Sequence, residues 1–326
     1  MRRRLLLFLT VLLVVASCTR ERSDTVILKF NTVAGPQQAQ VKALEVFASE
    51  VAALSGGKVE VRIFHSGQLG NQQTQVVGVM RGSIEMTFTD PNSLAQFDKK
   101  LGIFGAAYLF RDLGHTERVM YGPIGREYFE RLAVNQGIRP LGSWYLGTRQ
   151  VNLRDREVRT PEDMNGVKLR MPDAPQWIAM GKALGANPTP LGFNEVYLAL
   201  KTGVIDGQDN PLPTDKAQKF YEVTKYIILT NHQMGMVWPT INEKKWQSLA
   251  PEYREWILQA LASARKYHDA LVVRDEAELL REFEQEHGMT IIKPDVEAFR
   301  LHSRAFYMAY EQEWGEGTYD RIQSVQ

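Results

Sequence analysis

The chain has 326 residues, of which 44% are hydrophobic and 24% charged, and these values are ordinary for a globular protein whose core can serve two lobes. Its 39 lysines and arginines are balanced by 38 acidic residues, so no basic surplus exists to hold a nucleic acid.

The first residues resemble a targeting signal. Residues 1–18, MRRRLLLFLTVLLVVASC, place three arginines before an apolar run that is short for a membrane span. The run ends in Val15-Ala16-Ser17-Cys18, which resembles the lipobox of bacterial lipoproteins. We interpret residues 1–17 as a lipoprotein signal peptide and Cys18 as the lipidated residue. The alternative is an ordinary signal peptide with a cysteine near the cut.

Under either interpretation, we expect the mature chain to be exported. Cys18 is the only cysteine, so a disulfide, a thiol nucleophile and a cysteine-based metal site within the chain are all excluded. Cleavage before Cys18 removes three arginines and no acid, which leaves 36 of the 39 basic residues against 38 acidic ones. No second long apolar run follows, so we expect a soluble body.

The first half of the mature chain alternates strand and helix patterns. Period-two or short apolar runs predict strands over 26–30, 58–64 and 84–88. Apolar residues at helical spacing predict helices over 38–57 and 73–82. This order is typical of an α/β domain with a largely parallel sheet.

The alternation restarts after a break near residues 140–150. We expect strands over 142–153, 167–172 and 187–191, and helices that begin at Thr160 and Asn194 and cover 176–185. Residues 205–213, IDGQDNPLP, read as a turn rich in amide and acid groups. Two α/β units in series predict a two-lobed architecture, with a ligand cleft at the strand ends between the units.

One long helix is expected near the C-terminus. Residues 251–287 contain no internal proline or glycine, and a helix of that length would be about 55 Å long. Because this exceeds one small lobe, we expect the helix to run across both.

The sequence lacks the short motifs of common enzymes. It contains no GxSxG, GxGxxG, Walker loop or HExxH, and its six histidines are scattered without metal-ligand spacing. We therefore expect no catalytic residue, no cofactor and no metal. An exported enzyme acting on sugar acids, built from residues distant in sequence, is the alternative of another class.

Two arginines stand at the ends of predicted strands. Arg170 ends the strand in VKLRMP, just before Pro172, and Arg149 follows an aromatic pair in WYLGTRQ. Each alone reads as a solvated edge residue. Together with the amide-rich segment 205–213, they favour an anion site, because a guanidinium matches a carboxylate in a bidentate pair.

The segments GTRQ, GVKLRMP, LGANPTPLGFNEVYLALKTGVIDGQDNPL and AQKFYEV resemble the solute-binding proteins of TRAP transporters. Within that family the chain is most similar to the sialic-acid and sugar-acid binders of the DctP type. The similarity covers nearly the whole mature chain and is densest between Arg149 and His232. It implies the two-lobed periplasmic-binding-protein fold, an extracytoplasmic receptor, and a sodium-driven membrane permease as partner.

The resemblance also implies roles for individual residues. Arg170 would grip the ligand carboxylate, Arg149 would support the acid, Asn210 would reach the ligand, and Phe193 would pack on it. Asp90 and Gln72 occupy further ligand positions.

The same resemblance reveals departures from the sialic-acid binders. Asn71 and Gln72 replace acids, Val33 replaces an asparagine and Asp90 replaces a glutamate. A smaller sugar acid, such as a hexuronate or an aldonate, is therefore the preferred ligand, with sialic acid and a C4-dicarboxylate as alternatives. A sensor component that reports to a membrane receptor remains a third class. We expect lobe I to comprise 25–146 plus about 236–275, and lobe II 147–235 plus about 276–326.

Overall fold

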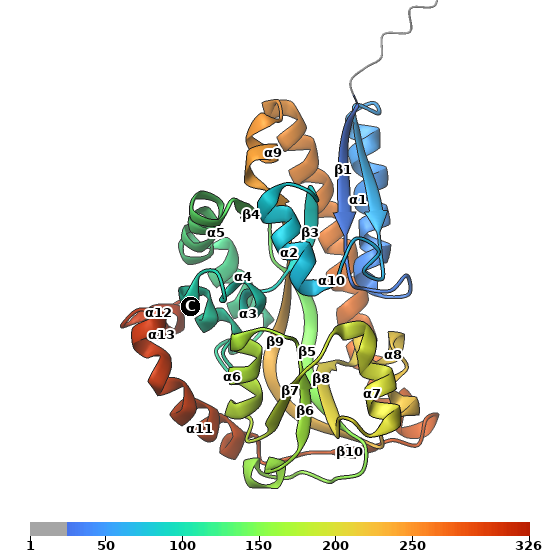
Figure 1. Ribbon diagram of the computed structural model, residues 1–326, viewed down its shortest axis with the longest axis vertical. Coiled ribbons are helices and arrows are strands. Elements are labelled where there is room, and N and C mark those ends of the chain that lie inside the picture. The colour runs from blue at the N-terminus through green and yellow to red at the C-terminus, as the bar shows by residue number, and fades with distance from the viewer. Residues whose placement is uncertain (1–24) are drawn as a thin grey trace, which may run out of the picture.

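The computed structural model describes residues 25–326 as a two-lobed α/β protein (Figure 1). The predicted signal peptide and Cys18 lie outside the described residues. Within residues 25–326, no helix combines the length and apolar character that a membrane crossing requires.

The first lobe is built on strands at one end of a mixed sheet. Its strands follow the order β2-β1-β3-β9, with β4 also on β9, and β1 pairs in parallel with both β2 and β3. These strands are β1 (Val26–Asn31), β2 (Val59–Phe64), β3 (Met86–Thr89), β4 (Ile138–Pro140) and β9 (Tyr226–Asn242). The helices of this lobe are α1 (Ala39–Leu54), α2 (Gln72–Arg81), α3 (Pro91–Leu94), the 3₁₀ helix η1 (Lys99–Gly105), α4 (Leu113–Tyr121), α5 (Pro123–Gln136) and α9 (Glu243–Ser248).

The second lobe continues the same sheet in the order β9-β5-β8-β6-β7, with β10 on β9. Here β6 pairs in parallel with both β7 and β8, whereas β5 is antiparallel to β8 and β9. The strands are β5 (Trp144–Leu153), β6 (Lys168–Met171), β7 (Asn187–Pro190), β8 (Gly207–Pro211) and β10 (Thr290–Ile292). The helices are α6 (Pro175–Ala183), the 3₁₀ helix η3 (Phe193–Glu195), α7 (Val196–Thr202) and α8 (Leu212–Ala217).

Strand β9 and one long helix join the lobes. The start of β9 pairs with β5 and β10 in the second lobe, and its end pairs with β3 and β4 in the first. Helix α10 (Pro251–Gln285) packs on α1 in the first lobe and on α8 in the second (Figure 1). Asp269 and Glu276 of α10 accept hydrogen bonds from the backbone N–H groups of Tyr145 and Thr148 in β5. The predicted two-lobed fold with a long helix across both lobes is thus confirmed.

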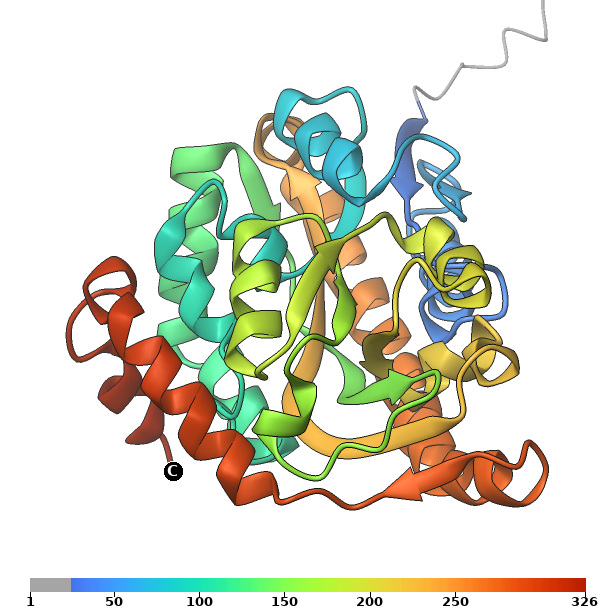
Figure 2. The same cartoon turned by 60° about the horizontal axis from the view of Figure 1, so that its bottom comes forward.

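The C-terminal segment runs along one side of the molecule (Figure 2). Helix α11 (Val296–Tyr307) packs on α6, and α12 (Glu311–Trp314) packs on η1. Trp314, together with Ile322 of α13 (Thr318–Gln323), joins a buried cluster that includes Phe104 of η1 and Leu132 of α5. The lobe boundaries expected from the sequence stay a prediction.

Several local predictions were wrong. The helix expected from Thr160 is a single 3₁₀ turn (Pro161–Met164), because Gly166 adopts a positive φ of 75° and β6 begins two residues later. Asn194 lies inside η3 rather than at a helix cap, and its side chain donates to the carbonyl of Ser66 at 3.3 Å. The sheet is mixed rather than largely parallel, since β9 is antiparallel to β3, β4 and β5.

The expected turn over 205–213 is mostly strand β8. Its polar side chains are buried rather than solvated, because they bond to one another and to neighbouring elements. Asn210 donates to Gln208 at 2.5 Å, and Gln208 donates to Asp215 of α8 at 2.9 Å. A polar strand can occupy the interior only when its side chains are satisfied in this way.

Candidate functional site

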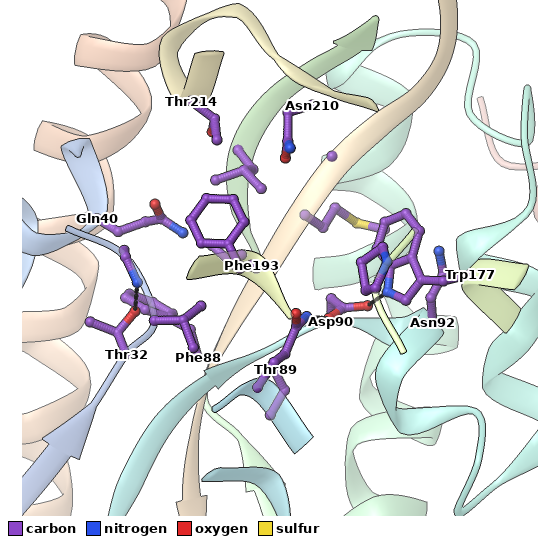
Figure 3. Close-up of a pocket in the computed structure, with 18 of the residues that line it drawn as sticks. Thr32, Gln40, Phe88, Thr89, Asp90, Asn92, Trp177, Phe193, Asn210 and Thr214 are labelled. Atoms are coloured by element: carbon purple, nitrogen blue, oxygen red, sulfur yellow. Dashed lines mark hydrogen bonds between the residues drawn. The ribbon is translucent and has the colours of Figure 1, made fainter. Parts of the chain in front are cut away.

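A cavity lies between the lobes, where the carboxyl ends of parallel strands from both sides meet (Figure 3). Arg170, Asn210 and Phe193 stand at or just after the ends of β6, β8 and β7. Thr32 and Asp90 follow β1 and β3 from the other lobe. Strand ends of open α/β sheets are the usual position of a ligand crevice. The cavity brings together all six site residues expected from the sequence, namely Gln72, Asp90, Arg149, Arg170, Phe193 and Asn210.

Arg170 is a buried cation without a carboxylate partner among residues 25–326. The residue is only 1% exposed, and its Nε donates to the carbonyl oxygen of Leu191 at 2.9 Å. One terminal nitrogen, Nη2, is buried and has no hydrogen-bond partner. Burial lowers the pKa of Arg170 to about 10, against a partly compensating attraction from Asp209. A guanidinium in this position is incomplete without an anion.

Arg149, in contrast, is neutralised within the protein. Its Nε donates to Oδ2 of Asp209 at 2.6 Å, and its Nη2 donates to the carbonyl oxygen of Asp209 at 2.6 Å. His232 lies on the same carboxylate, with Nε2 3.2 Å from Oδ2. Burial alone would raise the pKa of Asp209, but the charge of Arg149 and the hydrogen bonds from His232 and Arg149 outweigh burial and hold that pKa well below its ordinary value. The arginine pair therefore carries one balanced and one unbalanced charge.

Phe193 and Asn210 lie beside the two arginines. The guanidinium of Arg170 lies 5.9 Å from the centre of the Phe193 ring, and Phe193 occupies the middle of the cavity in Figure 3. The side-chain oxygen of Asn210 accepts from Nη2 of Arg149 at 3.3 Å. An aromatic face and an amide thus flank the guanidinium groups, which suits a ligand with both C–H and hydroxyl groups.

Asp90 connects the two lobes. Its Oδ1 accepts a hydrogen bond from Nε1 of Trp177 in α6 at 3.1 Å, drawn as a dashed line between the two labelled residues in Figure 3. Its Oδ2 accepts from Gln72 at 3.1 Å and from the hydroxyl of Ser93 at 2.6 Å. Burial raises the pKa of Asp90, and the hydrogen bonds from Ser93 oppose that effect. The face of Trp177 also covers Arg149, whose guanidinium carbon lies 4.6 Å from the ring centre.

Trp177 and Asp209 line or support the cavity but were not expected from the sequence as site residues. Trp177 lies in the first turn of α6, two residues after Pro175, and nothing in a helical pattern marks an aromatic residue there as a cavity wall. Asp209 is the one acid in GQDNP, and the antiparallel register of β5 and β8 pairs it with Val151, so that it lies diagonally across from Arg149 on the same face of the sheet. Further polar walls come from Gln40, Asn92, Thr214 and Gln233. Across residues 25–326, no group of His, Cys, Asp and Glu residues is arranged to hold a metal ion.

The model of the family DctP, described as "Bacterial extracellular solute-binding protein, family 7", matches residues 30–313. The chain belongs to this family. The resemblance to TRAP-transporter solute-binding proteins stated from the sequence is thus confirmed, and this membership makes the chain an extracytoplasmic solute-binding protein.

Solved structures share the fold of this family 7 protein. A TRAP periplasmic solute-binding protein from Roseobacter denitrificans with bound 3-deoxy-D-manno-oct-2-ulosonic acid is 36% identical, with a TM-score of 0.89 over 93% of this chain and 100% of that one. A second such protein from the same species, with bound L-galactonate, is 30% identical, with a TM-score of 0.85 over 92% of this chain and 98% of that one.

Among curated relatives, the sialic acid-binding periplasmic protein SiaP of Vibrio cholerae is 28% identical over 97% of this chain and 98% of its own length. The matched family and these three relatives are all described as binding proteins. What each of them binds is a property of that protein.

Proposed function

We propose that this family 7 protein binds a sugar acid, the class that includes hexuronates and aldonates, and delivers it to a sodium-coupled membrane permease. The observation that carries the proposal is the buried guanidinium of Arg170, which has an unpartnered Nη2 and forms no ion pair within residues 25–326. A ligand carboxylate supplies both the missing charge and the missing acceptor. The bound acids of the two Roseobacter relatives support this chemistry.

The proposed clamp takes one carboxylate. Arg170 makes charge-assisted hydrogen bonds worth roughly 1.5–3 kcal/mol each, so loss of the guanidinium weakens binding by on the order of 10² to 10⁴. Arg149 is already balanced by Asp209, and it supports the acid and its neighbouring hydroxyls together with Asn210. A single unbalanced cation favours a monocarboxylate over a dicarboxylate.

Binding is coupled to closure of the lobes. Lobe I, proposed as 25–146 plus about 236–275, contributes Asp90 and Gln72. Lobe II, proposed as 147–235 plus about 276–326, contributes both arginines, Phe193 and Asn210. A ligand that contacts both lobes stabilises the closed state by its differential affinity for that state. Lipidation at Cys18 would hold the receptor at a membrane, near its permease.

A thermal-shift screen tests the function. The mature protein is heated with uronates, aldonates, octulosonates, sialic acid and dicarboxylates, and with galactitol as an uncharged control. An acid at 100 times its Kd stabilises the fold by about 2.7 kcal/mol, whereas galactitol should leave the melting temperature unchanged. Recovery of the acid unchanged, checked by NMR, separates a receptor from an enzyme. A protein that responds to none of the acids would contradict the proposal.

A further inference from the structure

A second cavity opens beside the first, at the mouth of the cleft. Gln72 and Pro172 line both cavities, so they form the border between them. The second cavity has a volume of about 250 Å³, compared with about 90 Å³ for the first. A ligand that fills the first cavity and is longer than it can therefore extend past Gln72 into the second.

The wall contributed by the first lobe is rich in amides. It consists of side chains from the N-terminal turn of α2 and from α3 and the residues just after it, namely Asn71, Gln72, Gln73, Ser93 and Gln96. The amide nitrogen of Gln72 donates to Asp90 and to the hydroxyl of Ser93, at 3.1 and 3.2 Å. Its amide oxygen has no such bond within residues 25–326 and remains available to accept one. Amides and hydroxyls both donate and accept, as sugar hydroxyl groups require.

The wall contributed by the second lobe excludes other ligand classes. It includes the exposed carboxylates Asp173 and Glu195, and neither lysine nor arginine lines this cavity. A second carboxylate on the ligand would therefore meet like charges without a cation to balance it. The apolar residues are limited to Pro172, Pro190 and Leu191, which is little surface for an aliphatic or aromatic tail.

Leu191 connects this cavity to the arginine clamp. Its carbonyl oxygen accepts from Nε of Arg170, and the residue itself lines the second cavity. The cation thus lies close to the border, and the second cavity has exposed residues in its walls, such as Gln73 and Asp173.

We propose that the second cavity is the subsite for the uncharged, hydroxylated tail of the ligand. This inference rests on the proposed function. It means that the chain binds a monocarboxylic sugar acid longer than six carbons. This extends the ligand class beyond the hexuronates and six-carbon aldonates preferred from the sequence.

Calorimetry with two acids and two variants tests the subsite. L-galactonate represents six carbons, and 3-deoxy-D-manno-oct-2-ulosonate represents eight. The natural protein should bind the eight-carbon acid at least tenfold more tightly. Gln73→Trp fills the second cavity from an exposed position on α2 that does not line the first cavity. It should weaken the eight-carbon acid at least tenfold and change galactonate binding less than twofold.

Arg81→Trp, at the other end of α2 and outside both cavities, is the matched control and should change neither affinity. Equal affinity of the natural protein for both acids, or equal weakening of both by Gln73→Trp, would overturn the subsite while leaving the acid clamp in place. Binding of neither acid would instead overturn the subsite and count against the proposed function.

Discussion

Arg149 and Asp209 form a buried ion pair across strands β5 and β8, with the Arg149 Nε 2.6 Å from Oδ2 of Asp209. The second arginine of the cavity, Arg170, forms no such pair within residues 25–326. The two arginines, Arg149 and Arg170, have the same chemistry and similar burial, 4% and 1% exposed. Only Arg149 has a counter-ion within the described part of the chain. We therefore assign Arg149 mainly to holding the site and Arg170 to holding the ligand.

Arg149→Met should destabilise the protein strongly. The substitution leaves the Asp209 carboxylate buried without its cation, a change that costs about 3–5 kcal/mol in comparable pairs. Urea unfolding of the ligand-free protein measures the loss. Lys225→Met is the control, because it breaks the exposed pair with Asp155 and should leave the free energy of unfolding nearly unchanged. If both variants lose a similarly small amount of unfolding free energy, the structural role of Arg149 would be contradicted.

Asp215→Asn should make the protein more stable, and increasingly so as the pH rises. Burial raises the pKa of Asp215 well above its ordinary value of 3.8. The folded state therefore keeps a proton that the unfolded chain has lost, and this group lowers stability as the pH rises above about 4. Asparagine keeps the acceptor for Gln208, whose bond to Asp215 is 2.9 Å, and it carries no charge.

The two proteins should unfold at the same urea concentration at pH 4, and the variant should gain roughly 1–3 kcal/mol by pH 8, the usual cost of an unpaired buried group. Asp173→Asn, at an exposed position of the same lobe, is the control and should follow the natural protein at every pH. If the unfolding free energies of Asp215→Asn and of the natural protein change in parallel between pH 4 and pH 8, the raised pKa of Asp215 would be refuted.

The residues that line the cavity were largely predictable from the sequence, partly from local patterns and partly from the family resemblance. Alternation and the following proline placed Arg170 at a strand end, and the family resemblance supplied Phe193, Asn210, Asp90 and Gln72, all of which line one cavity. The absence of internal proline and glycine likewise predicted the long helix, which ends at Gln285 rather than at residue 287.

The difference between the two arginines could not be predicted. It depends on the register that sets β5 against β8, and on the approach of His232 to the same carboxylate. Strand β8 was interpreted as a turn for a related reason, because GQDNP looks solvated until its partners in three dimensions are known. The bond from Trp177 to Asp90 joins residues 87 positions apart, a separation that no local pattern reports.

Trp177→Phe should weaken acid binding without unfolding the protein. Phenylalanine keeps an aromatic face over Arg149 but removes the indole N–H that donates to Asp90 in the other lobe. One hydrogen bond contributes about 0.5–1.5 kcal/mol, so the Kd should rise about two- to tenfold. Small-angle scattering of the ligand-free protein should also show a larger radius of gyration. Trp246→Phe, at the buried position of α9 in the first lobe, should change neither value. An unchanged Kd for Trp177→Phe would exclude a role in ligand binding for the bond from Trp177 to Asp90.

Arg170→Lys tests most directly whether the Arg170 guanidinium binds the ligand carboxylate, as we propose. Lysine retains the positive charge but loses the planar fork that pairs with both carboxylate oxygens. Arg159→Lys, at an exposed position of the same lobe, is the matched control. Calorimetric titration with the acid found in the thermal-shift screen should show Kd raised at least tenfold for Arg170→Lys and unchanged for Arg159→Lys. An Arg170→Lys protein that is folded and binds with unchanged affinity would contradict the clamp.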